Sequence, residues 1–499
     1  MSAEYNERLD GKLPDWSLDQ VLPMLQKILP ARAIIYAPEA LRPYECDGLS
    51  VYKCVPLVVV LPESTEQVIA ILKLCDQQEI PIVPRGAGTG LSGGALPLKS
   101  GILLSLARMN QILSIDPHQQ QARVQPGVRN LAISEAVADL GLYYAPDPSS
   151  QIACSIGGNV AENAGGVHCL KYGLTVNNIQ SLECVLADGT LLEVGDDCLD
   201  RPGFDLLALL HGSEGMLAIV TEISVKLLPI PDAAKVMLIS FDDVQCAGRA
   251  VADVIAAGVV PAGLEMMDKL AIQAAEDFAK AGYPRDAEAI LLCELDGNAL
   301  DVEVELAHLK TVFESSGALE VRVAESDEQR ARFWAGRKSA FPAVGRISPD
   351  YYCMDGTIPR KALPDILQGI SDLSKRYDLK VANVFHAGDG NLHPLILYDA
   401  NIPSELKKVE EMGGEILQLC VSVGGTITGE HGVGREKINQ MCVQFASAEL
   451  QQFHATKSAF DPKRILNPNK NIPTLSRCAE FGAMHVHNGE LPFPDLERF

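Results

Sequence analysis

The stretch that decides the fold is Pro84-Arg85-Gly86-Ala87-Gly88-Thr89-Gly90-Leu91-Ser92-Gly93-Gly94-Ala95. Five glycines stand within the nine residues from Gly86 to Gly94. Without side chains in the way, the backbone N–H groups of such a run are free to wrap around a pyrophosphate. The apolar residues 80–83 directly before it predict a buried strand. We therefore expect a phosphate-binding loop at the end of a strand, and a flexible surface loop is the other interpretation.

The segments around this loop indicate which kind of cofactor domain it belongs to. Residues 57–61 and 80–83 are continuous apolar runs with a helical pattern at 68–75 between them, which predicts a β-α-β unit. The residues after the loop, 102–106, predict another strand where a nicotinamide-binding fold has a helix, and the glycine spacing also differs. The sequence thus favours a phosphate-bearing cofactor but not a Rossmann fold.

Two more stretches of small residues follow. One runs from Pro146 to Gly166, and the other, Gly212 to Val220, leads into a strand predicted at 221–227. So many small residues do not build a core of their own, and they suit a backbone that lies against a large flat ligand.

In their order and spacing, the three stretches resemble the flavin domain of the vanillyl-alcohol oxidase family, over roughly residues 53–231. The resemblance implies FAD between two α+β subdomains, with its pyrophosphate on the first loop. Some members attach the flavin through a His of this loop; here Thr89 stands at that place, which implies non-covalent FAD. The residues expected to contact FAD are Arg85, Gly86, Gly88, Thr89, Gly90, Ser92, Gly93 and Gly94 in the first stretch, Pro146, Asp147, Ser155, Gly158, Asn159, Asn163, Gly165, Gly166, Tyr172 and Gly173 in and after the second, and Glu214, Gly215, Ile219 and Asn467 further on.

A second constellation is Val384-Phe385-His386-Ala387-Gly388-Asp389-Gly390-Asn391-Leu392-His393-Pro394. It predicts two short strands joined by a tight loop that brings two imidazoles together. Thr428-Gly429-Glu430-His431-Gly432 adds a carboxylate and a third imidazole. Two His and a Glu can hold zinc, manganese or iron, with His431 beside them as a base. Histidines with purely structural hydrogen bonds are the alternative.

The second half of the chain predicts a cap domain. Pro229-Ile230-Pro231 breaks the chain, and the alternating strands and helices after it indicate an α+β layer with an antiparallel sheet. Within it, Arg337 follows two aromatic residues and could bind a carboxylate through two parallel hydrogen bonds. A surface Arg at a helix end is the other interpretation.

The cap segments resemble those of flavin dehydrogenases for the D-2-hydroxy acids lactate, glycolate and 2-hydroxyglutarate. This resemblance implies a divalent metal on His386, His393 and Glu430. It also implies that Asn391 contacts substrate or metal and that His431 is the base. The 2-hydroxyglutarate enzymes carry a Thr and a Lys where Phe341 and Cys353 stand here. Since a second carboxylate would then lack polar partners, a small monocarboxylate is expected.

Residues 44–50, 351–356 and 478–487 resemble the flavin subunits of bacterial glycolate oxidases, along essentially the whole chain. We accordingly expect an N-terminal arm at 1–52 with a helix at 21–29, an FAD-binding domain at 53–231, and a cap with a returning C-terminal helix at 232–470. A tail at 471–499 would dock a partner or lie in solvent. The resemblance implies two partners, a second flavin-like subunit and an iron–sulfur subunit that feed membrane quinone, at the cytoplasmic face of the inner membrane.

Composition bounds these expectations. A chain of 499 residues predicts at least two domains, and a net charge of -23 argues against nucleic acid and anionic membrane surfaces as partners. No apolar run reaches the ~18 residues that a membrane span needs, and the acidic N-terminus is unlike a secretory signal. Thirteen cysteines without a CxxC pair indicate a reducing cytoplasm and no iron–sulfur cluster on this chain.

The function expected is the oxidation of glycolate to glyoxylate, or of D-lactate to pyruvate. Arg337 would orient the carboxylate, and His431 would take the hydroxyl proton while hydride passes to FAD. One alternative is a stand-alone D-lactate or D-2-hydroxyglutarate dehydrogenase. Another is a metallohydrolase, which leaves the three glycine-rich stretches unexplained, and a third is a non-catalytic flavoprotein scaffold.

Overall fold

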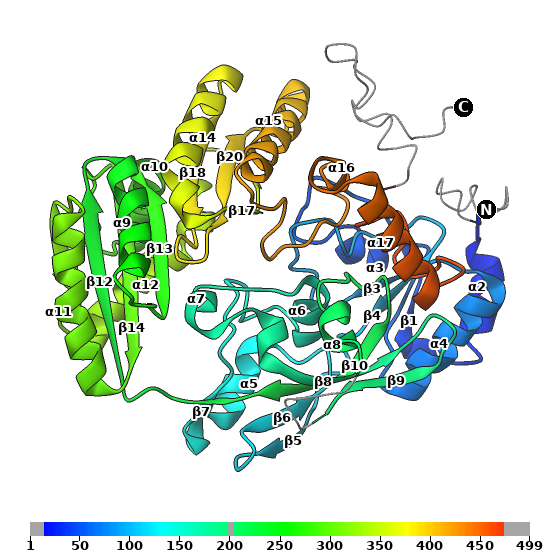
Figure 1. Ribbon diagram of the computed structural model, residues 1–499. Coiled ribbons are helices and arrows are strands. Elements are labelled where there is room, and N and C mark those ends of the chain that lie inside the picture. The colour runs from blue at the N-terminus through cyan, green and yellow to red at the C-terminus, as the bar shows by residue number, and fades with distance from the viewer. Residues whose placement is uncertain (1–13, 197–202, 474–499) are drawn as a thin grey trace.

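The computed structural model describes residues 14–196 and 203–473. The first half of the chain forms two subdomains, each built on its own sheet, and the cap stands against them (Figure 1). The tail expected at 471–499, with its predicted docking role, falls almost entirely outside the described residues.

The first subdomain is a four-stranded sheet in the order β1-β2-β4-β3, in which β2, β4 and β3 run parallel and β1 runs antiparallel to β2. Its central strands are buried on both faces, as expected of continuous Val, Ile and Leu runs. Helices α2 and α4 pack on it. The bounds are α2 Leu18–Leu25, β1 Ile34–Ile35, β2 Val58–Val60, α4 Thr65–Gln78, β3 Ile82–Arg85 and β4 Ile102–Ser105.

The helix of the N-terminal arm is shifted from the expected 21–29. It begins at Leu18, because the N–H of Ser17 donates to the Gln20 side chain and closes the first turn. It ends at Leu25, and a short turn follows before Pro30. The arm then contributes β1 to the first sheet.

The second subdomain is an antiparallel sheet in the order β5-β6-β10-β8-β9. Helices α5 and α6 cover its inner face, and α6 carries part of the second glycine-rich stretch. The bounds are β5 Ile112–Asp116, β6 Gln121–Val124, α5 Asn130–Val137, α6 Ile156–Glu162, α7 Cys169–Tyr172, β8 Ile179–Val185, β9 Leu191–Gly195, α8 Leu206–Leu210 and β10 Ile219–Lys226.

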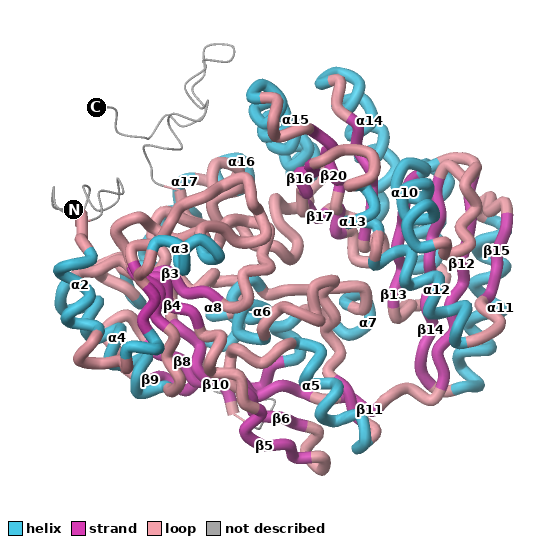
Figure 2. The backbone as a smooth tube through the Cα atoms, turned by 180° about the vertical axis from the view of Figure 1, so that it is seen from behind, coloured by secondary structure: helices cyan, strands magenta, loops and turns pink. Residues whose placement is uncertain are grey.

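The cap is an antiparallel sheet of seven strands in the order β15-β12-β14-β13-β18-β20-β16. Helices α9, α11, α14 and α15 cover one face, and α10, α12 and α13 cover the other (Figure 2). The bounds are β12 Ala233–Phe241, α9 Val244–Ala256, β13 Gly263–Asp268, α10 Lys269–Ala279, β14 Ala289–Gly297, α11 Ala299–Ser315, β15 Glu320–Val323, α12 Asp327–Lys338, α13 Ala340–Val344, β16 Asp350–Cys353, α14 Leu363–Tyr377, β18 Lys380–Phe385, β20 Pro394–Tyr398 and α15 Pro403–Ser422.

The end of the described chain returns from the cap to the first subdomain. Helix α17 (Ser447–Phe460) follows the short α16 (Met441–Gln444), and Leu466 then pairs with Ile82 beside β3. This return brings Asn467 to the first glycine-rich loop, where its amide donates to the Gly94 carbonyl. No helix in the described ranges is both long and apolar enough to cross a membrane.

Candidate active site

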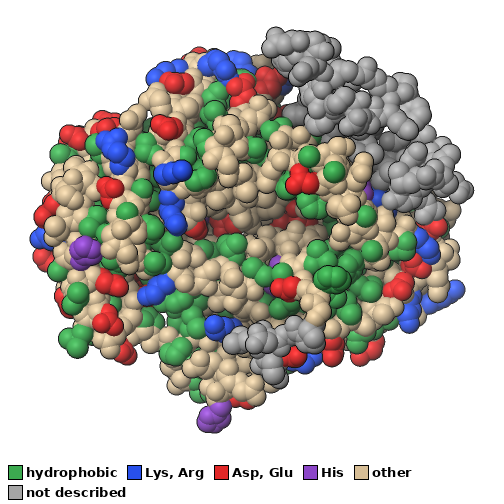
Figure 3. Space-filling view, in the orientation of Figure 1, with side chains coloured by type: hydrophobic (Ala, Val, Ile, Leu, Met, Phe, Trp, Pro, Cys, Tyr) green, Lys and Arg blue, Asp and Glu red, His purple; other side chains and the backbone are tan. Residues whose placement is uncertain are grey.

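A cavity of about 380 Å³ extends from the first glycine-rich loop to the histidine loop of the cap. The face of the molecule seen in Figure 3 is hollowed between cap and flavin-side subdomains, and acidic side chains show in the hollow. Of the residues expected to contact FAD, those that line the cavity are Arg85, Gly86, Gly88, Thr89, Gly90, Gly94, Ser155, Gly158, Asn159, Glu214, Gly215 and Ile219. Those that do not line it are Ser92, Gly93, Pro146, Asp147, Asn163, Gly165, Gly166, Tyr172, Gly173 and Asn467.

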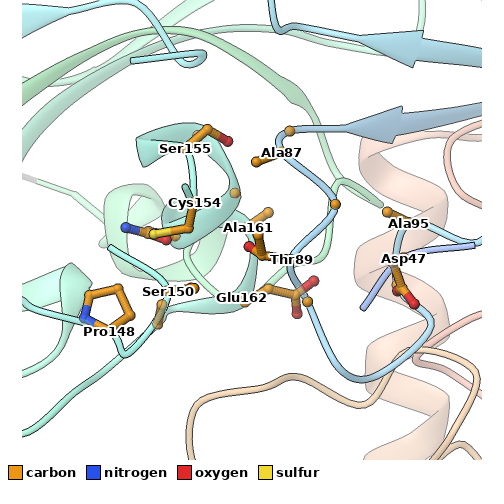
Figure 4. Close-up of a pocket in the computed structure, with 18 of the residues that line it drawn as sticks. Asp47, Ala87, Thr89, Ala95, Pro148, Ser150, Cys154, Ser155, Ala161 and Glu162 are labelled. Atoms are coloured by element: carbon orange, nitrogen blue, oxygen red, sulfur yellow. The ribbon is translucent and has the colours of Figure 1, made fainter. Parts of the chain in front are cut away.

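The glycine-rich loop lies close against helix α6, as the close-up shows for Ala87 and Ser155 (Figure 4). A Cβ on Gly86 would lie 2.2 Å from the Ser155 hydroxyl oxygen. Gly88 has a φ of +72°, and a Cβ there would lie 2.1 Å from the Arg85 guanidinium. The Ser155 hydroxyl is buried without a hydrogen-bond partner in the described chain. The closely packed glycines, the Arg85 cation and the unpartnered Ser155 hydroxyl together fit the pyrophosphate of FAD.

At the other end of the cavity, β18 and β20 place His386 and His393 face to edge, with ring centroids 5.0 Å apart. Glu430 Oε1 lies 3.4 Å from the Nε2 atom of each ring. All three side chains lie deep in the protein, the two imidazoles at 2% exposure. Two imidazole nitrogens and one carboxylate oxygen that converge in this way fit a divalent metal with positions left open for substrate.

A residue that sequence reasoning missed fixes the first of these imidazoles. His386 Nδ1 donates to Glu265 Oε1 at 2.8 Å, which leaves Nε2 to face Glu430. Glu265 lies on β13, and its other oxygen is 2.6 Å from Arg337 Nη2. Burial alone would raise the pKa of the Glu265 carboxyl, but His386 and Arg337 hold this pKa below its usual value. Glu265 therefore stays ionised and selects the tautomer that a metal ligand needs.

The loop Thr428–Gly434, which carries Glu430 and His431, is anchored by a second unpredicted residue. The Asp355 carboxylate accepts hydrogen bonds from the Thr428 hydroxyl at 2.6 Å and from the backbone N–H groups of residues 429–431 at 2.9–3.3 Å. Lys437 Nζ lies 3.4 Å from it. Burial would raise the pKa of Asp355, but His431 and Lys437 lower it well below the ordinary value. A permanently charged, fully buried carboxylate thus orients the loop.

His431 is placed to act as a base. Its ring stacks on His393, with centroids 4.8 Å apart and planes at 13°, and it lines the cavity. Its Nε2 lies 3.9 Å from Glu430 Oε1, on the side of the two ligand imidazoles. Burial, aided by the neighbouring His393, lowers the pKa of His431 to about 4. The imidazole is therefore neutral at pH 7 and can accept a proton.

Neither Asn391 nor Arg337 lines the cavity. The Asn391 side-chain oxygen is buried in the histidine loop, without a hydrogen-bond partner among the described residues. Arg337, at 2% exposure, is paired with Glu265 and does not line the cavity, although its Nε also lacks an acceptor there. The residues of the same segment that do line the cavity are Lys338, Phe341 and Pro342.

Two residues expected to contact FAD, Tyr172 and Asp147, take part in contacts between the flavin-side subdomains and the cap. The Tyr172 hydroxyl donates to Asp296 of the cap strand β14. Asp147 lies 2.9 Å from His168 Nδ1, and the other nitrogen of that ring lies 3.5 Å from Glu294 of the cap. These contacts place the second glycine-rich stretch at the interface between cap and flavin-side subdomains.

Comparisons with known proteins agree with this geometry. The family profile "FAD binding domain" matches residues 56–195, and the profile "FAD linked oxidases, C-terminal domain" matches residues 230–471. Among curated proteins, the chain is 65% identical to glycolate oxidase subunit GlcD of Escherichia coli over the full length of both. It is 32% identical to a D-lactate dehydrogenase of Anaerostipes hadrus over 90% of this chain and 97% of that one.

Among solved structures, p-cresol methylhydroxylase has the same fold, with a TM-score of 0.79 and 18% identity over 93% of this chain and 99% of that chain. The expected α+β architecture of FAD-binding domain and cap is thereby confirmed. The profiles, the relatives and the fold together show that the chain is a flavoprotein oxidoreductase that belongs to the family of FAD-linked oxidases.

Proposed function

We propose that the protein oxidises glycolate to glyoxylate, and D-lactate to pyruvate, as the flavin subunit of a multi-subunit glycolate oxidase. The observation that carries this proposal is the convergence of His386, His393, Glu430 and His431 at one end of the FAD cavity. The full-length identity of 65% to a glycolate oxidase subunit supports glycolate as the substrate.

When bound, the metal would act as a Lewis acid that lowers the pKa of the substrate hydroxyl, and FAD would take up the hydride from the α-carbon. His386 Nε2, His393 Nε2 and Glu430 Oε1 are the proposed ligands. His431 receives the hydroxyl proton at Nε2, and its low pKa keeps this atom free at neutral pH. Asn391, with its unpartnered side-chain oxygen, contacts substrate or metal.

We expect Arg337 to contact the substrate carboxylate, although its side chain does not line the cavity in this structure. The guanidinium lies directly behind the ligand His386, through Glu265, and keeps a buried Nε donor without an acceptor. An anionic substrate would supply that acceptor, because a buried donor left unpaired costs about 1–3 kcal/mol. The same residue would then serve both the metal ligand and the substrate.

The size of the substrate would be limited by Phe341. Its ring packs edge-on against His393, with centroids 6.0 Å apart, and against Tyr351 at the same distance. Cys353 lies in the buried cluster behind Phe341 and does not line the cavity; burial raises the pKa of its thiol well above the usual value, so it offers no charge to a second carboxylate. The apolar ring of Phe341 at the cavity favours a two- or three-carbon monocarboxylate.

The electrons would leave through partner subunits, one flavin-like and one with iron–sulfur clusters, at the cytoplasmic face of the inner membrane. Two relatives of this chain are named as subunits of a glycolate oxidase, which supports a complex. Ten described cysteines are free thiols scattered over the fold, in keeping with an electron relay that is carried by another chain.

Steady-state rates with an artificial electron acceptor test the proposal on glycolate, D-lactate, L-lactate and D-2-hydroxyglutarate. We expect kcat/KM to be highest for glycolate or D-lactate. A preference for D-2-hydroxyglutarate would refute the argument from Phe341 and Cys353. The Anaerostipes relative, a D-lactate dehydrogenase, supports the alternative of a stand-alone enzyme. Such an enzyme would show high D-lactate turnover and little glycolate turnover.

A further inference from the structure

Glu214 lies in the third glycine-rich stretch, yet its side chain reaches into the cap. Its Oε1 accepts the N–H of Val433 and its Oε2 accepts the N–H of Gly434, both at 2.7 Å. Asn471 Nδ2 donates to Oε1 at 2.6 Å. The residue is 3% exposed and has a φ of +51°, a backbone conformation that few side-chain-bearing residues adopt. Such a conformation persists only where the surroundings hold it in place.

The catalytic loop is thus held by two buried carboxylates from opposite sides. Asp355 of the cap binds the backbone of residues 429–431, and Glu214 of the flavin half binds residues 433 and 434. Glu430 and His431 belong to the segment that Asp355 binds, and the residues that Glu214 binds follow directly after Gly432. Asp355 is a charged acceptor, which makes its hydrogen bonds stronger than neutral ones. Burial raises the pKa of Glu214, so its anchor rests on the geometry of its two hydrogen bonds of 2.7 Å.

The loop also has no room to shift toward the flavin half. Gly432 has a φ of +80°, and a Cβ there would lie 2.0 Å from Glu162 Oε2. A Cβ on Gly434 would lie 2.2 Å from the Ser92 carbonyl oxygen. The same carbonyl accepts N–H groups from residues 435 and 436. The loop therefore rests directly on the segments that line the FAD cavity.

We infer that Glu214 is a positioning residue that fixes the distance between the base His431 and the flavin. It couples the two halves of the enzyme because its backbone belongs to the FAD-lining stretch while its carboxylate holds the catalytic loop. This inference rests on the proposed function of His431. Displacement of a reacting group by about 1 Å costs on the order of 100-fold in rate.

Two variants test the inference, with Glu183→Gln as the matched control. Glu214→Gln keeps one acceptor oxygen and turns an NH2 group toward the second N–H. Asn471→Gly removes only the supporting donor and keeps a residue suited to the φ of +58° at that position. Glu183 is a carboxylate of the same half that accepts from Thr221 on the sheet β8–β10 and takes no part in the site.

The first measurement is anaerobic flavin reduction by glycolate in a stopped-flow instrument, on protein that retains its FAD. We expect the rate constant of Glu214→Gln to fall about 10–100-fold, that of Asn471→Gly to fall less, and that of Glu183→Gln to match the unmodified enzyme. A partly misfolded preparation would lose amplitude while its rate constant stayed unchanged. An unchanged rate constant in Glu214→Gln would overturn the inference.

Hydrogen–deuterium exchange gives a readout that does not depend on turnover. We expect faster exchange at residues 430–436 in Glu214→Gln, because Gln offers a single acceptor oxygen and one of the N–H groups of Val433 and Gly434 loses its acceptor. Unchanged exchange in this segment would also overturn the inference. If the unmodified enzyme were not reduced by glycolate or D-lactate, the proposed function would fail, and the exchange data would still decide whether Glu214 holds the loop.

Discussion

Replacement of Glu265 by Gln tests how the proposed metal ligand His386 is held. The Gln side-chain oxygen can still accept from His386 Nδ1, but its NH2 group then faces the Arg337 guanidinium. Glu265 and Arg337 are 1% and 2% exposed, and their N–O distance is 2.6 Å. Loss of one partner of such a buried pair costs about 3–5 kcal/mol of folding free energy. Loss of the orienting carboxylate lowers metal affinity about 10–100-fold.

These two effects are separable by experiment. Metal affinity is measured by titration of chelator-stripped protein in metal buffers, with bound metal counted by elemental analysis, and stability by denaturant unfolding. The double variant Glu265→Leu/Arg337→Leu should recover most of the stability, because no buried charge is left unpaired, but it should not recover metal affinity. The control Glu222→Gln breaks the half-exposed pair with Arg123 and should cost at most about 1 kcal/mol.

One result would contradict the role of Glu265 in metal binding. If Glu265→Gln bound zinc or manganese as tightly as the unmodified protein, the hydrogen bond to His386 would have no part in metal binding. His386 would then have to be held by the fold alone.

Four further predictions concern the base, the cofactor loop and the substrate wall. His431→Asn should reduce the rate of flavin reduction about 100- to 10,000-fold with the FAD spectrum retained, as loss of a general base does. Activity requires neutral His431, and burial lowers the pKa of this residue to about 4. We therefore expect kcat/KM to stay level from pH 7 to about pH 5 and to decline only as the pH falls toward 4. A decline centred at pH 6–7 would contradict this prediction. Gly88→Ala should lower the FAD content of purified protein, since the new Cβ meets Arg85 at 2.1 Å, and full FAD content in this variant would speak against close packing of the loop. Phe341→Ala should raise kcat/KM for longer 2-hydroxy acids relative to glycolate by roughly 10-fold, and an unchanged ratio would remove Phe341 from the substrate wall.

The parts of the site that are local in sequence could be predicted from it. His386 directly follows β18 and His393 directly precedes β20, and these two strands pair with each other, so a spacing of seven residues brings the imidazoles together. Glu430 and His431 are neighbours in a glycine-flanked loop. The glycine-rich loop at Gly86–Gly94 directly follows a buried strand. The loop residues that line the cavity are glycines or residues next to a glycine, so the sequence pattern could indicate them.

The parts that depend on long-range contacts could not be predicted. Glu265 meets His386 across 121 residues because β13 pairs with β18, and nothing in the apolar pattern of β13 marks one Glu as functional. Asp355 and Glu214 act on the backbone of the catalytic loop, and backbone hydrogen bonds leave no pattern in the side chains. The sequence could indicate Arg337 as a candidate for carboxylate binding, but its pairing with Glu265 depends on how α12 packs against the sheet.

The most direct test of the central claim is anaerobic reduction of the bound flavin by glycolate, with and without a divalent metal. Protein that retains FAD is stripped of metal with a chelator, mixed with glycolate in the absence of oxygen, and then supplied with zinc or manganese. We predict that the oxidised-flavin absorbance persists in the stripped protein and bleaches after metal is restored, and that His386→Ala does not bleach in either case. Bleaching at the same rate in the metal-free protein would show that flavin reduction does not depend on a metal.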